Sequence, residues 1–361
     1  MIRLSWRQFR AQATVAFGAL AVIAVVLAIT GPQLVHLYYT SVVPCRAQGD
    51  CSVATAAFVG RDKLLQALSL VLVVVPGVIG VFWGAPLLAR ELETGTYQLA
   101  WTQSVPRKRW LAVKLGLVGL ASVAVAGLLS LMVTWWSSPI DRVNADPFTV
   151  FDQRGIVPFG YAAFAFALGV TAGMLLRRTV PAMAATLVVF AGIRVAVERL
   201  VRPHLIAPLR IVSAVVPPSP GNGNGPGNAA AAAPSPGDWV LADQTINAAG
   251  HVVGQGGLIG YGGGRFGILF SPAGDGRMTL QGVGLCPNRF PAQASVAPGG
   301  GPNAAFSQAA GKCVTRLVRQ VLAYQPTSRY WPLQGYELAI FGGLALILAG
   351  FSFWWMRRRF A

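Results

Sequence analysis

Long apolar stretches separated by short polar segments dominate the pattern of this chain. A helix that crosses a membrane needs about 20 largely apolar residues, and six stretches reach that length. The pattern therefore predicts an all-α polytopic membrane protein. Its six transmembrane helices are expected over about residues 14–38, 64–83, 111–136, 157–176, 180–200 and 336–356.

Composition agrees with this pattern. Of the 361 residues, 54% are hydrophobic and 11% are charged, whereas a soluble domain carries about 25% charged residues. The net charge of +17 could indicate nucleic-acid binding, but the basic clusters adjoin apolar stretches. Interleaved aromatic and basic residues and zinc-ligand spacing are both missing from the sequence. We expect membrane lipids as partners, and no nucleic acid.

The placement of Lys and Arg predicts the orientation of the spans. Cytoplasmic segments of membrane proteins are enriched in basic residues, and here basic residues are dense in 1–13, 85–114, 177–179 and 357–361. Both termini are therefore expected in the cytoplasm. The first apolar stretch is longer than the 7–15 residues of a signal peptide, so we expect an uncleaved anchor.

All four cysteines fall in segments that this topology places outside. Disulfides persist in oxidising compartments, so an even, wholly external set favours two bonds. We expect Cys45 to pair with Cys51 and Cys286 with Cys313, because a span separates those two regions in sequence. Free buried thiols are the alternative; a metal site is disfavoured because histidine is missing near either pair.

Three domains follow from the topology. Residues 1–200 hold helices one to five, 201–335 form a small extracytoplasmic domain, and 336–361 hold the sixth helix and a basic tail. The Gly-, Ala- and Pro-rich tract 215–237 is a flexible linker by composition. Residues 238–323 mix β-like runs with a helix-like stretch at 313–324, which predicts a loop-rich, mixed fold.

The polar segment 85–114 is the first cytoplasmic loop in this topology. Leu87 to Glu93 is expected to continue the second helix, and Gly95 to end it as a C-cap. Thr96 to Thr102 is expected to form a short amphipathic helix. Such a helix, joined stiffly to two spans, could transmit force to them.

The residues of this loop resemble a known family. The acidic pair, the Gly-Thr that follows it and a Lys opening the next helix are similar to the first cytoplasmic loop of ABC-2 type exporter permeases. Segments 194–208 and 324–337 resemble parts of a bacterial subgroup of these permeases, whereas the long outer domain departs from the simplest members. The residues that carry the loop's resemblance are Arg90, Glu91, Glu93, Gly95, Thr96, Gln103, Ser104 and Lys114.

The resemblance implies a permease subunit in a bacterial plasma membrane. Two copies, as a homodimer or heterodimer, would work with two ATPase subunits that dock on the loop, which acts as a coupling helix. Glu91 and Glu93 would contact or orient that interface; alternatively they are a solvated helix end paired with Arg90 or Arg107. The expected coupling residues are Arg90, Glu91, Glu93, Gly95, Thr96, Tyr97, Trp101, Gln103 and Arg107.

Motifs for catalysis are missing from the sequence. The phosphate-binding pattern G-x-x-x-x-G-K-[ST] does not occur, and the only Gly-Lys, Gly311-Lys312, is followed by Cys313. His36, His204 and His251 lack a catalytic or metal-binding spacing. We therefore expect no catalytic, cofactor or metal residues here, with ATP and Mg on the partner subunit. A membrane enzyme is disfavoured, and a non-transporting sensor or regulator remains the alternative.

Charges near the outer ends of spans five and six are candidates for function, because charge within a membrane is costly. Arg194, Glu198 and Arg202 recur at i, i+4 and i+8, so they are expected to share a helix face. Together with Glu337 they could form an outer gate or contact substrate. The alternative is a self-neutralised ladder at the membrane interface.

Overall fold

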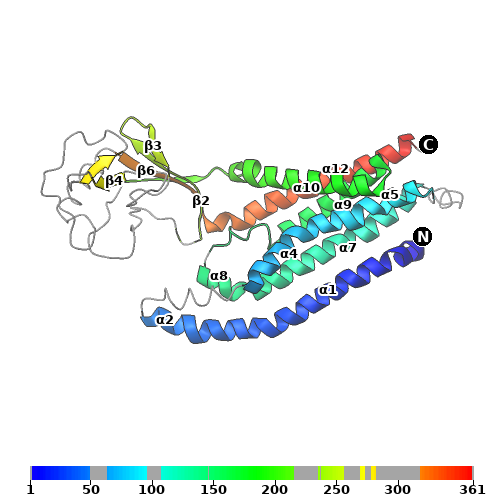
Figure 1. The fold of residues 1–361 in the computed structure, drawn as a ribbon, viewed down its shortest axis with the longest axis horizontal. Coiled ribbons are helices and arrows are strands. Elements are labelled where there is room, and N and C mark those ends of the chain that lie inside the picture. Colours follow the sequence, from blue (N-terminus) through cyan, green and yellow to red (C-terminus); the bar gives the residue numbers. More distant parts are fainter. Residues whose placement is uncertain are drawn as a thin grey trace. The chain divides into compact units, whose positions relative to one another are not determined.

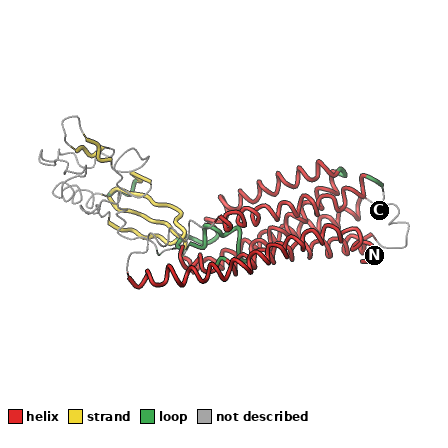
Figure 2. Tube along the Cα trace, turned by 60° about the horizontal axis from the view of Figure 1, so that its bottom comes forward, coloured by secondary structure: helices red, strands yellow, loops and turns green. Residues whose placement is uncertain are grey.

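We describe the fold from a computed structural model of the chain (Figures 1 and 2). The chain forms two compact units. The first, Met1–Ile206 with Ser328–Ala361, is helical, and the second, Ala207–Thr327, contains the strands. The structure describes residues 2–48, 63–95, 107–144, 146–214, 235, 237–255, 269–272, 278–281 and 318–359.

The first unit is a bundle of long helices that run side by side (Figure 1). Within the described ranges, six helices are long and apolar enough to cross a membrane, which confirms the six predicted spans. The start of α1 and the end of α12 lie at the end of the bundle where α5 ends and α7 begins. The helices are α1 (Ile2–Leu37), α2 (Val43–Gln48), α4 (Lys63–Ile79), α5 (Ala85–Glu93), α7 (Arg107–Trp136), α8 (Ser138–Asn144), α9 (Val157–Leu176), α10 (Thr179–Ala196) and α12 (Tyr330–Arg359).

Three π-helical turns join some of these helices without a break. They are η1 (Tyr38–Val42) between α1 and α2, η2 (Gly80–Gly84) between α4 and α5, and η3 (Val197–Val201) after α10. The described residues also form two short 3-10 turns, η4 (Arg202–His204) and η5 (Thr327–Arg329). A π-helical turn holds more residues than an α-helical turn, so it rotates the faces of the helix that follows.

The first helix is longer than predicted. Through η1 it continues from α1 to Gln48, past the predicted end near residue 38, because Pro32 removes only one backbone donor and neighbouring turns keep theirs. Cys45 lies in α2. Cys51, Cys286 and Cys313 lie outside the described residues, so the two predicted pairings stay predictions.

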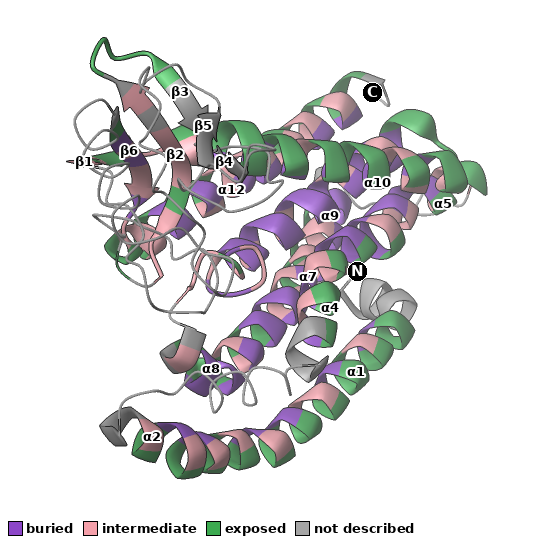
Figure 3. Ribbon diagram, turned by 60° about the vertical axis from the view of Figure 1, so that its left-hand side comes forward, coloured by how far each residue is buried: buried purple, intermediate pink, exposed green. Residues whose placement is uncertain are grey.

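Helix α9 lies at the centre of the bundle and is buried along most of its length (Figure 3). It packs against α4, α5, α7, α10 and α12. Small residues make its contact with η2 and α5 very close: a Cβ added at Gly169 would lie 2.3 Å from the Gly80 carbonyl oxygen, and one at Gly173 would lie 2.4 Å from the Ala85 carbonyl oxygen. Small residues let helix backbones approach closely in a membrane, where packing drives helix association.

The second unit contains a four-stranded antiparallel sheet in the order β1-β6-β2-β3 and a separate β4-β5 hairpin. Gly250 has a positive φ of 83° in the turn between β2 and β3, a conformation that glycine adopts without steric cost. The strands are β1 (Leu209–Ala214), β2 (Trp239–Asn247), β3 (Val252–Gln255), β4 (Leu269–Pro272), β5 (Met278–Gln281) and β6 (Val318–Gln325).

The helix predicted over 313–324 is wrong for its described part, because β6 occupies 318–325. The apolar residues there recur at helical spacing, but β6 pairs with β1 on one side and β2 on the other. That pairing satisfies the backbone of a central strand and buries Gln320 and Leu322 on one face. Tertiary pairing thus overrides the local helical pattern.

Replacing Gly169 with Ala tests the close contact. We expect Gly169→Ala to lower the free energy of unfolding by about 1–3 kcal/mol, because the new methyl group meets backbone atoms that cannot move aside cheaply. The matched control is Gly192→Ala in α10, where an added Cβ meets nothing within 4 Å. Thermal unfolding of both variants in one detergent would measure the effect. Equal midpoints for the two variants would contradict the packing argument.

Candidate functional site

Two groups of polar side chains lie at opposite ends of the helical unit. One surrounds the ends of α5 and α7, which flank the predicted coupling loop. The other lies where α9 and α12 begin and α10 gives way to η3 and η4. Thr96, Tyr97, Trp101 and Gln103 lie outside the described residues, and Arg107 is described only as the first residue of α7.

Glu91 forms an ion pair with Lys114, linking the end of α5 to the first turns of α7. Lys114 Nζ donates to Glu91 Oε1 and lies 4.6 Å from the centre of the Trp110 ring. Lys114 is only 4% exposed, so the carboxylate neutralises a charge that would be costly if left alone. Glu91 therefore pairs with Lys114, and this differs from both partners considered for it, Arg90 and Arg107.

Glu93 binds the start of α10. Its Oε2 accepts hydrogen bonds from the Thr179 backbone N–H at 3.1 Å and from Thr179 Oγ1 at 2.8 Å. The first N–H groups of a helix have no partner within the helix, and Arg178 at the N-cap makes no side-chain capping bond. Glu93 therefore caps α10 from another helix. Its negative charge also complements the helix dipole at that end.

The chain leaves α5 through a left-handed residue. The Thr94 N–H bonds to the Arg90 carbonyl at 3.0 Å, and Gly95 has a φ of 72°, as expected for a glycine just past a helix end. Arg90 itself is exposed. Both flanks of the loop are thus attached to helices before the chain enters the part that lies outside the described residues.

A buried ionic cluster occupies the other end. It joins Arg202, Glu337 and Asp152 around Tyr161. Arg202 forms two parallel bonds with the Glu337 carboxylate, Nε to Oε2 at 2.8 Å and Nη2 to Oε1 at 2.9 Å, and Nη2 also pairs with Asp152 Oδ1. Arg202 is 6% exposed and Glu337 is 1% exposed. Bidentate pairing of this kind is the strong form of an arginine–carboxylate bond.

Tyr161 lies at the centre of the cluster and is fully buried. Its hydroxyl oxygen lies 2.7 Å from Asp152 Oδ1 and 2.5 Å from Glu337 Oε1, so its one proton can be donated to either carboxylate. The guanidinium of Arg194 lies over the Tyr161 ring at 4.6 Å, and Arg194 Nη1 donates to the Val73 carbonyl at 2.7 Å. Two cations and two carboxylates balance formally in this cluster.

The structure brings together three of the four predicted outer residues, Arg194, Arg202 and Glu337, but not Glu198. Glu198 is exposed in η3, and no ion pair involves it among the described residues. The predicted common face of Arg194, Glu198 and Arg202 is wrong, because the π-helical turn inserts extra residues between the two arginines. The alternative of a self-neutralised ladder is wrong for the same reason.

Sequence reasoning missed Tyr161, Asp152 and Gln334. Gln334 Oε1 accepts from the N–H groups of Ile156 and Val157, at 3.0 Å each, and so caps α9. Its Nε2 donates to the Phe151 carbonyl at 2.8 Å. These residues lie far apart in sequence and carry no periodic signal, although a Tyr within a span and a Gln beside Glu337 are polar enough to have been examined.

Neutralising Glu337 tests the cluster. We expect Glu337→Gln to lower the free energy of unfolding by about 3 kcal/mol, because removing one partner leaves a buried guanidinium undercompensated. Glu198→Gln is the matched control and should change it by less than about 0.5 kcal/mol, since Glu198 is exposed. Thermal and denaturant unfolding of both variants would measure the difference. A destabilisation shared equally by the two variants would contradict the cluster's role.

Comparison with known proteins adds a family assignment to this geometry. No curated protein and no solved structure matches the chain. A family model described as "ABC-2 membrane transporter related" matches residues 17–202. The match covers more than half of the chain, including most or all of each of the first five spans, both flanks of the loop, and Arg194 and Arg202. The chain therefore belongs to the ABC-2 membrane transporter-related family.

Proposed function

We propose that this chain is the transmembrane permease subunit of an ATP-driven exporter, powered by a separate ATPase subunit that docks on loop 85–114. Family membership makes it a membrane component of an ABC transporter. The observation that carries the finer proposal is the anchoring of both loop flanks, by Glu91 to Lys114 and by Glu93 to Thr179. A loop that served only to connect two spans would need neither anchor.

These anchors connect the loop mechanically to the membrane-spanning helices. Helices α4 and α5 form one continuous rod through η2, and α7 begins at Arg107 within the second flank of the loop. A push on the loop therefore acts on two spans at once. Through Glu93 it also acts on α10, which is the third span tied to this end. Rigid elements with fixed attachment points are what transmits a displacement between distant sites.

The energy source lies on the partner in this proposal. ATP and Mg bind the ATPase, because the sequence lacks the glycine-rich phosphate loop. Two permease copies and two ATPases form the complex in a bacterial plasma membrane. Both termini lie in the cytoplasm, as the dense basic residues at the loop end of the bundle favour. Export as the direction rests on the resemblance of the loop.

The buried cluster fits an outer gate in this scheme. Arg202 and Asp152 belong to segments at the outer end of the bundle, and Glu337 opens the sixth span. Holding them together keeps Arg202 paired with two carboxylates in a medium of low dielectric constant. Separating the helices would expose those charges to a polar path, and closing them would restore the pairing.

Replacing residues 96–104 with a Gly-Ser segment of equal length tests docking. We expect the variant to fold with an unchanged thermal midpoint but to lose the ATPase that co-purifies with the tagged wild-type chain in mild detergent. ATP hydrolysis by the eluate should disappear with it. The control replaces nine residues within the linker 215–237 in the same way and should retain the ATPase. A wild-type chain that purifies alone under several mild detergents would instead favour a sensor or regulator.

A charge exchange separates anchoring from direct contact. We expect Glu91→Lys alone to bring two cations together and lower the free energy of unfolding by about 3 kcal/mol, with reduced ATPase retention. The double variant Glu91→Lys with Lys114→Glu restores an opposite pair, so most of the stability and ATPase retention should return. The non-additivity of the cycle measures the pairing directly.

One outcome of this exchange would contradict the anchoring role of Glu91. If the double variant regains stability but still releases the ATPase, Glu91 contacts the ATPase itself and does not act through Lys114. Lys114→Met alone serves as a further control, because it removes the cation while leaving Glu91 able to reach solvent.

A further inference from the structure

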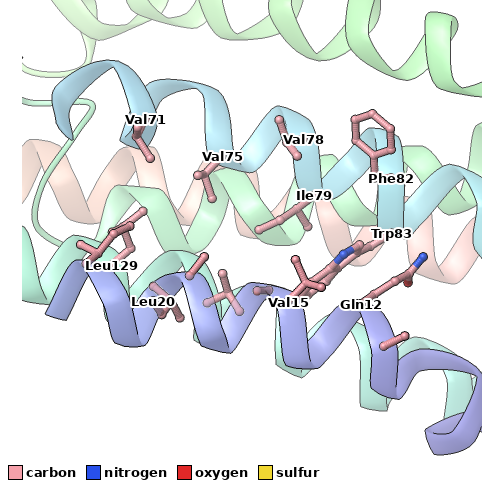
Figure 4. A pocket seen from close by; sticks show the side chains of 15 residues that line it. Gln12, Val15, Leu20, Val71, Val75, Val78, Ile79, Phe82, Trp83 and Leu129 are labelled. Carbon is pink, nitrogen blue, oxygen red and sulfur yellow. The ribbon is translucent and has the colours of Figure 1, made fainter. Parts of the chain in front are cut away.

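A groove of about 630 Å³ lies between the N-terminal half of α1 and the C-terminal half of α4 with η2, and α7 forms its floor (Figure 4). That volume is within the range of small-molecule sites, roughly 300–1,000 Å³. Branched aliphatic side chains make most of its wall, including Val15, Leu20, Ile23, Val75, Ile79 and Leu129. The described residues that line the groove belong to neither of the polar groups described above.

The groove has the length of one membrane leaflet. On α1 it extends from Ala11 to Ile23, which is about 18 Å at a rise of 1.5 Å per residue. Half of the hydrocarbon core of a bilayer is about 15 Å thick. A straight chain lying along the two helices would therefore run from the membrane surface to about the bilayer midplane.

The polarity of the groove changes along its length. Gln12 lies at one end, beside the indole of Trp83, while Val71 and Leu129 lie at the other (Figure 4). Gln12 is next to the basic first turns of α1, where Arg10 is exposed and Arg3 and Arg7 precede it. The groove thus offers an amide and nearby positive charge at one end and only apolar surface beyond them.

The groove opens to the side of the bundle. Helix α1 is attached to α7 through the buried residues Leu20 and Leu27, and through a hydrogen bond from Trp136 Nε1 to Thr30 Oγ1 at 2.9 Å. Along the groove Val15 of α1, Val78 of α4 and Phe82 of η2 stay exposed. At this depth in a membrane an apolar groove does not hold water, so what fills it comes from the surrounding lipid.

We propose that this groove binds one acyl chain of an anionic phospholipid, with the headgroup at the Gln12 end and the tail between α1 and α4. The lipid would fill the groove between α1 and α4 and contact both helices. In the orientation given under the proposed function the Gln12 end lies in the cytoplasmic leaflet, whereas binding of the lipid does not rest on that orientation. Positive charge near a membrane surface favours anionic headgroups.

Two pairs of variants test the proposal. Ala19→Phe on α1 and Val75→Phe on α4 place a ring in the groove, while Ala21→Phe and Val74→Phe add the same ring to residues of the same helices outside its lining. Each full-length chain is reconstituted in vesicles of equal phosphatidylglycerol and phosphatidylcholine, extracted in mild detergent, and examined by native mass spectrometry. Thermal midpoints of all variants establish that each pair folds alike.

The expected result is one phosphatidylglycerol per chain in the wild type and both controls, and about ten-fold lower retention in both groove variants. Full retention by the groove variants overturns the proposal, and so does equal loss in groove and control variants, which indicates loosely bound lipid. Equal amounts of the two headgroups overturn the choice of an anionic lipid. The proposal is also overturned if the wild type carries no lipid but forms dimers, and the groove variants form none. In that case the groove binds a second copy of the chain. The number of bound lipids is measured without the ATPase. A failure of the lipid proposal can therefore be distinguished from a failure of the docking proposal.

Discussion

The close contact of α9 with η2 and α5 is the constraint on which the helical unit depends. Gly169 and Gly173 of α9 meet backbone atoms of Gly80 and Ala85 at distances that leave no space for a Cβ. In a membrane, lipid tails are as apolar as leucine, so helices associate by packing and not by escape from water. Because α9 also touches α7, α10 and α12, its place against α4 and α5 determines where the other spans can lie.

The buried ion pairs form where this packing brings side chains of opposite charge together. Lys114 is buried beside Glu91, and Arg202 is buried between Glu337 and Asp152. Each pair joins residues from different segments of the chain, so it contributes only when the bundle is assembled. Buried pairs often add little stability over an apolar alternative but are very costly to break. They therefore specify one arrangement of the helices more than they strengthen it.

The sequence predicted the features that depend on local pattern and missed those that depend on distant contacts. Six spans could be placed because 20 apolar residues have few other solutions, and Gly95 could be read as a helix end because its conformation favours glycine. Lys114 could be identified as the partner of Glu91, 23 residues away, only from the folded bundle, in which α5 and α7 both pack against α9. The position of Tyr161 at the centre of a charged cluster depends on three other segments of the chain, so it could not be predicted from local pattern.

Two errors share one cause, which is the dominance of tertiary context over spacing. The residues at 318–325 carry a helical pattern, yet strands on both sides make them β6. Arg194, Glu198 and Arg202 have helical spacing, yet η3 rotates Glu198 away from the arginines. The Gly80-x-x-x-Gly84 and Gly169-x-x-x-Gly173 patterns were visible in the sequence, and they mark the contact that organises the bundle.

Helix α10 and the residues just beyond its end are attached to other elements at three positions along their length. This arrangement links the two ends of the bundle. Glu93 caps its first turn, Arg194 reaches the Val73 carbonyl on α4, and Arg202, just beyond its end, pairs with Glu337 on α12. A π-helical turn lies between Val73 and Glu93, and another between Arg194 and Arg202. Such turns have weaker hydrogen-bond geometry than α-helix and occur often at functional sites. A displacement of α5 therefore acts on α10 directly through Glu93, and the two π-helical turns are the places where the helices can yield without breaking the three attachments.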